Sequence, residues 1–168
     1  MVRSEDTGKL VLRLSVGILI LLHGIAKIGS GVGGIAGMLS SHGLPAELAY
    51  LAYIGEVVAP LLLIVGIFTR PAAWIIVVNM LFALFLAHMK DLGALNNMGG
   101  WKLELQGMFL FGALAVAFLG AGRFSVGGTG GKLNRPRAAS AAGHQARKTA
   151  DPSAWRRESG VQRSSQRP

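Results

Sequence analysis

Four apolar stretches, each long enough to cross a lipid bilayer, constrain this chain more than any other feature. A hydrocarbon core about 30 Å thick needs roughly 17 to 25 mostly apolar residues per helix. The stretches cover residues 10–28, 48–68, 71–89 and 101–120. They are apolar on all sides and lack the polar stripe of a water-soluble helix. The sequence therefore predicts an all-α protein, an integral membrane antiparallel four-helix bundle.

The connections between these stretches contain typical turn residues. Only Thr69 and Arg70 separate the second stretch from the third, and Pro71 suits a first helical turn, so we expect a tight hairpin there. The longest connection, residues 29–47, has the apolar pattern of a short interfacial helix or a re-entrant segment. Pro60 is expected to kink the second stretch and to free a backbone carbonyl.

Charge divides the chain into two parts. Residues 1–120 carry 7 basic and 6 acidic side chains, whereas residues 121–168 carry 10 basic and 2 acidic ones. We therefore expect a cytoplasmic N-terminus (1–9), a membrane domain (10–126) and a disordered basic tail (127–168) that contacts anionic lipid or an acidic partner. A basic nucleic-acid-binding domain is excluded. The absence of cysteine excludes thiolate chemistry and iron–sulfur ligation by thiolates.

Basic residues near the ends of the stretches predict the orientation. Lys and Arg resist translocation, so the side that holds more of them is cytoplasmic. This places both termini in the cytoplasm and the protein in the plasma membrane as a multi-pass protein. One side holds Arg3, Lys9, Arg13, Arg70, Arg123, Lys132, Arg135 and Arg137, and the other holds Lys27, Lys90 and Lys102. In the rival interpretation the first stretch is a cleaved signal peptide, but Glu5 and Asp6 do not fit one.

Three of the cytoplasmic-side arginines, Arg13, Arg70 and Arg123, are expected to anchor the protein. A long arginine side chain near a membrane surface can extend to the lipid headgroups, and we expect this of Arg13. The alternative is that Arg13 points inward, toward Asn79 or a tail residue.

Ionisable residues within membrane spans are costly and mark candidate functional sites. In the predicted orientation these residues gather toward the non-cytoplasmic end and form a candidate polar pocket, with Glu56 near the midplane. Glu56 must then be neutral or paired, so we predict a contact with Lys27 or His23. Glu104 and His88 are expected to form a shallower second layer. An aqueous funnel would narrow toward Glu56. The candidate pocket residues are His23, Lys27, Glu56, His88 and Glu104.

Three interpretations of this pocket remain open. The polar groups can satisfy one another and only hold the helices together. They can bind a quinone headgroup or another small polar molecule, since a His or Lys donor polarises a carbonyl while a carboxylate exchanges its proton. They can also form a proton or ion path. No cofactor follows with certainty, quinone is the candidate, and no metal is predicted because Glu-x-x-His pairs are lacking.

Small residues within the stretches are expected to let helices approach closely. These are Gly17, Gly24, Gly55, Gly66, Gly107 and Gly112.

Several short motifs follow one another in a characteristic order. They are Arg13 with Leu22–Lys27, then Gly43–Pro45, Gly55-Glu56, Leu63–Arg70, His88, Glu104 and Gly120–Ser125. Their order and spacing together resemble the DoxX family of small four-span membrane proteins of bacteria and archaea. The resemblance covers about residues 10–126. It departs at Val126-Gly127, where relatives often carry an acidic residue, and the basic tail lies outside the family pattern.

The resemblance implies a four-helix bundle in the plasma membrane and the same five pocket residues. Family members have been linked to a quinone-coupled thiosulfate oxidoreductase, as a subunit, and to membrane complexes that handle oxidative stress. It therefore predicts a subunit of an oxidoreductase complex more than a complete enzyme, with the bilayer and oxidoreductase subunits as partners. A homo-oligomer is compatible with it. The rival functions are a small-molecule or proton-coupled carrier and a non-catalytic scaffold.

Overall fold

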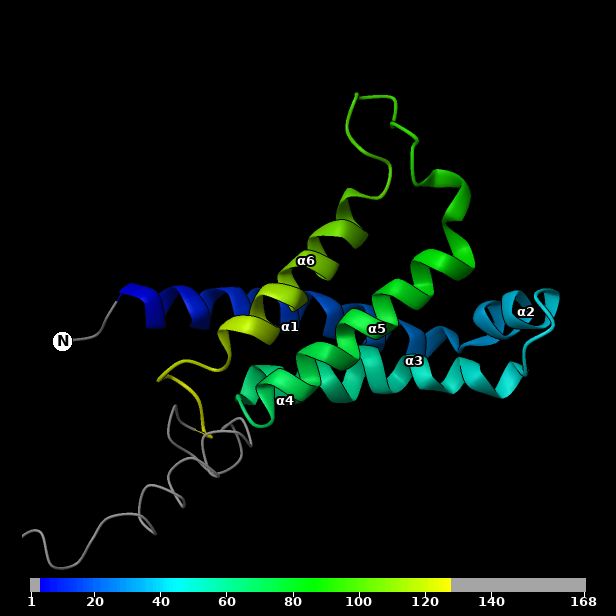
Figure 1. Ribbon diagram of the computed structural model, residues 1–168. Helices are drawn as coiled ribbons and strands as arrows, with labels where there is room; N and C mark the ends of the chain where they lie inside the picture. Colours follow the sequence, from blue (N-terminus) through cyan, green and yellow to red (C-terminus); the bar gives the residue numbers. More distant parts are fainter. Residues whose placement is uncertain (1–3, 128–168) are drawn as a thin grey trace, which may run out of the picture. The chain divides into compact units, whose positions relative to one another are not determined.

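A computed structural model describes residues 4–127, which lie within the first of two units of the chain, residues 1–134. These residues are helical and contain no strand beyond an isolated bridge between Leu95 and Trp101, which confirms the all-α prediction for this part (Figure 1). The predicted tail beyond Gly127 lies outside the described residues, as do Arg3, Lys132, Arg135 and Arg137. The elements are α1 (Ser4–Ser30), α2 (Gly33–Ser41), η1 (Ala46–Tyr50), α3 (Leu51–Tyr53), η2 (Ile54–Val58), α4 (Ala59–Val65), α5 (Thr69–Ala87), η3 (Met89–Asp91) and α6 (Glu104–Leu119).

Three helical segments of the described chain are long and apolar enough to cross a membrane: α1, the unbroken segment Ala46–Val65, and α5. The fourth predicted stretch, 101–120, is helical only over the 16 residues of α6. At 1.5 Å per residue α6 is about 24 Å long, less than a hydrocarbon core. It starts late because Trp101 belongs to the preceding turn, where its Nε1 donates a hydrogen bond of 2.9 Å to the Leu92 carbonyl.

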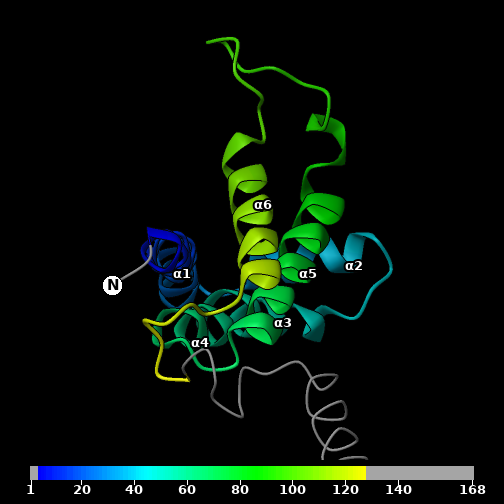
Figure 2. The same cartoon turned by 60° about the vertical axis from the view of Figure 1, so that its left-hand side comes forward.

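The helices form two pairs. In Figure 1, α1 and the segment from η1 to α4 run in opposite directions beside each other, and α5 and α6 do the same. Figure 2 shows that the second pair crosses the first obliquely. Apolar side chains from α1, α4, α5 and α6 fill the crossing, with Ile20, Leu63, Ile76 and Ala113 almost completely buried. The crossing therefore brings α1 against α6 and the segment η2–α4 against α5.

Helix α1 extends beyond the predicted residues 10–28 at both ends, from Ser4 to Ser30. Glu5 and Asp6 lie in its first turn, where negative charge is stabilised by the helix dipole. The helix ends before Gly31, whose φ of 77° is accessible chiefly to glycine. The additional first turn brings Asp6 to the chain after α6.

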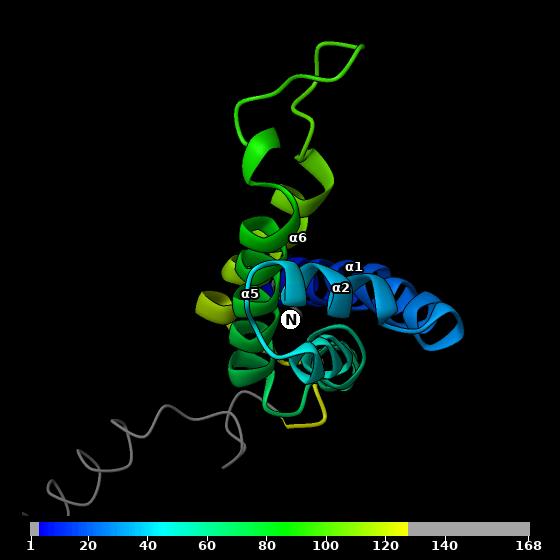
Figure 3. The same cartoon turned by 90° about the vertical axis from the view of Figure 1, so that its right-hand side faces the viewer.

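The long connection after α1 folds into α2, which confirms the predicted short helix. Figure 3 shows α2 beside the ends of α1 and α5. Val32, Leu39 and Ala49 form a second buried cluster, against which Leu86 of α5 packs. This cluster closes the end of the molecule where α1 ends.

The turn between α4 and α5 determines the position of Arg13. Gly66 ends α4 with a φ of 81°, and the Arg13 guanidinium occupies the space where a side chain at Gly66 would begin. Arg13 is only 2% exposed and donates a hydrogen bond of 2.7 Å from Nη2 to the Phe124 carbonyl. The prediction that Arg13 extends to the headgroups is therefore wrong, and the inward alternative holds with Phe124 in place of Asn79.

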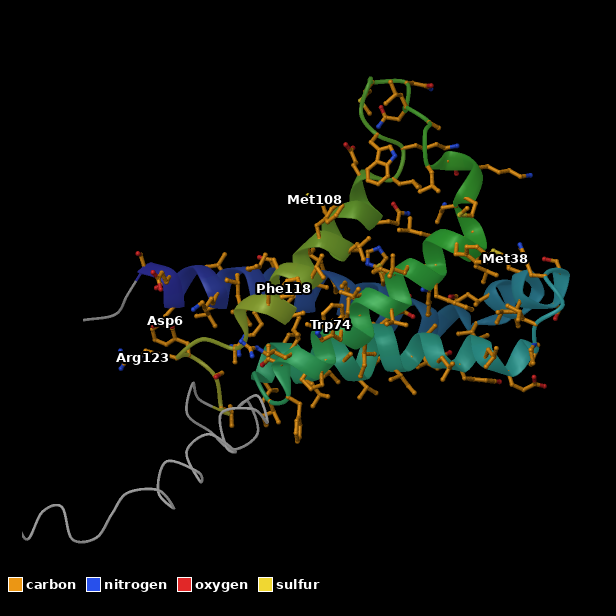
Figure 4. All side chains as sticks on the ribbon, viewed as in Figure 1. Asp6, Met38, Trp74, Met108, Phe118 and Arg123 are labelled. Atoms are coloured by element: carbon orange, nitrogen blue, oxygen red, sulfur yellow. The ribbon has the colours of Figure 1, made fainter. Side chains whose placement is uncertain are left out.

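The other two predicted anchors make contacts at the end of α6 and in the chain that follows it. Arg70 donates from Nη2 to the Phe118 carbonyl at 3.2 Å, and the backbone N–H of Arg123 donates to Asp6 at 3.2 Å. Figure 4 shows Asp6 beside Arg123, and Trp74 beside Phe118, with which it makes an edge-to-face ring contact. The role of Arg70 and Arg123 as membrane anchors stays a prediction.

Candidate functional site

An ion pair between Lys27 of α1 and Glu56 of η2 forms the centre of the candidate site. Lys27 Nζ donates a hydrogen bond to Glu56 Oε1, which confirms the predicted contact and selects Lys27 over His23. The Glu56 side chain is 5% exposed and the Lys27 side chain 32%. A carboxylate buried to this degree needs a cation and hydrogen-bond donors to remain charged. The pair therefore joins α1 to η2 through the most deeply buried acidic side chain among the described residues.

A local irregularity of the helix determines the position of Glu56. Residues Ile54–Val58 form a π turn that ends two residues before Pro60. Pro60 has no N–H to donate to the Glu56 carbonyl four residues earlier. Turns of this kind are frequent at functional sites. The irregularity expected at Pro60 thus occurs one turn earlier, at Glu56 itself.

Two glycines let neighbouring helices approach Glu56 closely. A Cβ atom added at Gly24 of α1 would collide with the backbone carbonyl of Glu56, and one added at Gly55 would collide with the Asn79 side chain of α5. Lys27 is one helical turn beyond Gly24, so the close approach brings its ammonium to the carboxylate. Of the six glycines predicted to allow close approach, five have a neighbour from another helix at this distance, whereas Gly107 meets only Trp101 of the loop before its own helix.

Asn79 is a second donor to the carboxylate. Its Nδ2 lies 3.4 Å from Glu56 Oε1, the oxygen that also accepts from Lys27. The other oxygen, Oε2, is buried and has no hydrogen-bond partner among the described residues. An unsatisfied buried acceptor costs about 1–3 kcal/mol, and more when it is charged. The site therefore has one strong acceptor that remains unsatisfied.

Two cavities meet at the ion pair. The larger has a volume of about 510 Å³, lies between η1–η2, α2 and α5, and has mostly apolar walls. The smaller, of about 150 Å³, lies between α1, α5 and α6 and includes His23 and Gln106 in its walls. Lys27, Glu56 and His88 line both. In place of the predicted aqueous funnel, the structure has two cavities with mainly apolar walls, the smaller of which also holds His23 and Gln106.

His23 lines the smaller cavity without contacting Glu56. Its Nδ1 lies 2.9 Å from the Leu19 carbonyl and therefore donates, and its ring makes an edge-to-face contact with Phe109 at 5.4 Å. Because Nδ1 carries the proton, Nε2 of the neutral ring is left as an acceptor. His23 can accept a hydrogen bond from a molecule in this cavity.

His88 connects the cavities to the loop between α5 and α6. Its Nδ1 lies 3.8 Å from Asp91 Oδ2, and Lys102 donates to Asp91 Oδ1 at 2.6 Å. The hydrogen bond from Lys102 lowers the pKa of the Asp91 carboxyl, and His88 acts in the same direction. Asp91 and Lys102 are half-exposed, so this row of polar side chains leads from the surface to the cavity wall.

Glu104 does not join the site. It lies beside Gly100 and Asn96 in the α5–α6 loop and lines neither cavity. The predicted second layer of His88 and Glu104 is therefore wrong, and Asp91 takes the place of Glu104. No group of three or more His, Asp or Glu side chains within residues 4–127 is placed to hold a metal ion.

Comparisons with known proteins agree with the motif resemblance. The family model described as DoxX matches residues 8–89. A Haemophilus influenzae protein, named "Uncharacterized protein", is 37% identical over 113 residues, which is 66% of this chain and 81% of the relative. The chain belongs to the DoxX family. The DoxX match includes the Lys27–Glu56 pair, Asn79 and His88, and it ends before Glu104 and α6.

A second relative of this DoxX protein has an activity in its name. The Bacillus subtilis protein "Putative oxidoreductase CatD" is 35% identical over 84 residues, which is 50% of this chain and 58% of that relative. The chain thus spans little more than half the length of this second relative. No solved structure matches the chain.

Proposed function

We propose that this DoxX protein is a membrane subunit of a quinone-linked oxidoreductase complex and that the cavities at Glu56 bind the quinone headgroup. The observation that carries the proposal is the buried, unsatisfied oxygen of Glu56 at the junction of two cavities. A ligand that donates a hydrogen bond to this oxygen removes the free-energy cost of leaving a buried acceptor unsatisfied, and this gain favours binding.

The residues present fit a quinone. A cavity of about 510 Å³ is within the range of small-molecule sites, and its apolar walls with few polar groups are typical of them. Lys27, Asn79 and His88 supply donors, and Glu56 supplies an acceptor. When bound, a quinone would supply two-electron redox chemistry, while Glu56 and Lys27 would orient its head and hold or release a proton.

The relatives support an oxidoreductase role only in part. The name of the Bacillus subtilis relative describes an oxidoreductase, and the matched segment of 84 residues covers half of this chain. We propose that the activity requires partner subunits, because the described residues hold no thiol and no cluster of metal ligands that could transfer electrons.

We further propose that residues 10–126 form one antiparallel four-span membrane domain in the plasma membrane, with both termini cytoplasmic. The spans are α1, the segment Ala46–Val65, α5 and the shorter α6. The excess of basic residues near Arg13, Arg70 and Arg123 supports this orientation.

A thermal-stability measurement tests the proposed function. The purified protein in mild detergent is heated with and without a short-chain quinone analogue, beside the variant Glu56→Gln and the control Glu5→Gln, which lies in the first turn of α1 and lines neither cavity. We expect the analogue to raise the melting temperature of the parent and of Glu5→Gln, and to do so much less for Glu56→Gln. If the analogue stabilises none of them, the Lys27–Glu56 pair is only a link between helices and the proposal fails.

A further inference from the structure

The hydrogen-bonding requirement of Glu56 restricts which ligand the cavity can accept. Lys27 and Asn79 both donate to Oε1, and in the ionised pair Oε2 can only accept a hydrogen bond. A ligand group that satisfies Oε2 must therefore carry an O–H or N–H. A group that can only accept hydrogen bonds, such as a carbonyl or ether oxygen, would place a second acceptor against Glu56 Oε2 and leave both unsatisfied.

The walls of the larger cavity show from which side such a ligand enters. Apolar side chains that line it are also exposed on the outer surface of the helices, and they belong to segments long and apolar enough to cross a membrane. They lie on both sides of the opening, on α3–η2 and on α5. These side chains are Leu51 (55% exposed), Ile54 (44%), Ile75 (38%), Val78 (63%) and Phe82 (42%).

An opening with an apolar rim on such a surface faces lipid and not water. A ligand can therefore leave its hydrocarbon chain among these rim side chains and place its polar head at Glu56. Charged or freely water-soluble molecules would have to cross the apolar rim, where their desolvation is costly.

From these observations we infer that the site takes a lipid-soluble amphiphile with a hydroxyl-bearing aromatic head, and that it binds the reduced, quinol form of a quinone in preference to the oxidised form. This inference rests on the proposed function and specifies the ligand of the same site. The hydroxyl donates to Glu56 Oε2, and its oxygen can accept from Lys27. The oxidised form has carbonyl oxygens only and leaves Oε2 unsatisfied.

A pair of compounds that cannot be oxidised or reduced at the site isolates this hydrogen bond. 4-Nonylphenol and 4-nonylanisole share the same chain and ring, and only the phenol can donate. We expect the parent protein, reconstituted in nanodiscs, to bind the phenol about tenfold more tightly, as one buried hydrogen bond to a charged group allows.

The variant Glu56→Gln is the informative control. Its amide can donate as well as accept, so the preference for the phenol should fall to less than threefold. Glu5→Gln, the same substitution in the first turn of α1 at a residue that lines neither cavity, should keep the preference of the parent. Equal binding of both compounds by the parent overturns the inference while the proposed function stands. Binding of neither compound overturns both. The comparison on the parent needs no variant, so it decides the question even if Glu56→Gln fails to fold.

Discussion

Replacing Gly24 by alanine tests the packing that brings Lys27 to Glu56. The new Cβ would overlap the carbonyl carbon and oxygen of Glu56, which are backbone atoms and cannot rotate away. Overpacking of this kind lowers the free energy of unfolding by about 1–3 kcal/mol, and we use about 3 kcal/mol because the atoms in the way belong to the backbone. Alanine regains about 1 kcal/mol over glycine in helix propensity. The net loss of unfolding free energy is about 2 kcal/mol.

The same helix offers a matched control. Gly29 also lies in α1, and a Cβ atom there would meet nothing within 4 Å. Gly29→Ala should therefore be neutral or stabilise the protein by up to about 1 kcal/mol. Unfolding in mixed micelles, followed by circular dichroism, measures the two variants side by side. The packing argument is refuted if Gly24→Ala is as stable as Gly29→Ala.

Three further predictions concern individual polar contacts. In a double-mutant cycle, Lys27→Met should lower the free energy of unfolding by about 3 kcal/mol, because it leaves Glu56 buried without a cation. Glu56→Gln should lower it by only about 1 kcal/mol, because Lys27 is partly exposed. If the two effects are purely additive, Lys27 and Glu56 do not form an interacting pair. The lowered pKa of Asp91 means that its contribution to stability is present above the ordinary Asp pKa and is lost as the pH falls through the lowered value. The melting temperatures of the parent and Asp91→Asn should therefore differ at pH 7, begin to converge below about pH 4, and become equal only below the lowered pKa. Asp6→Ala removes the acceptor of the Arg123 N–H and should cost about 1 kcal/mol, whereas Asp6→Asn retains an acceptor and should cost less, which chemical denaturation can measure.

The sequence was sufficient to predict the apolar helices and a contact of Glu56 with either Lys27 or His23, between which the structure selects Lys27. Both follow from local facts: the length of apolar runs, and the depth at which a lone carboxylate in a span must find a cation. Five of the six close-approach glycines were also predictable, since small residues in membrane helices usually mark contacts; the sixth, Gly107, accommodates Trp101 of the preceding loop. These inferences need no knowledge of how the helices cross.

The features that depend on how the two helix pairs cross could not be predicted from the sequence. Asn79 carries no charge, so its sequence position alone did not associate it with Glu56; the crossing of α5 over η2 brings it there. Glu104 was assigned to the site because it comes early in the fourth apolar stretch, at the same predicted end of the membrane as His88. The helix begins only at Glu104, whose carboxylate lies beside Gly100 and Asn96 of the preceding loop. Arg13 was expected at the surface because the vacant space at Gly66 and the return of the chain to Phe124 are tertiary features.

The measurement that tests the central claim most directly is photolabelling of the parent protein with an azidoquinone in nanodiscs, followed by mass spectrometry of the peptides. The account predicts labels on residues 51–56 and 75–88, which contain most of the wall of the larger cavity, with labelling suppressed by excess 4-nonylphenol and reduced in Glu56→Gln. Labels confined to α6, or labels on the cavity walls that neither the competitor nor the variant diminishes, would contradict the claim that this cavity binds a quinone at Glu56.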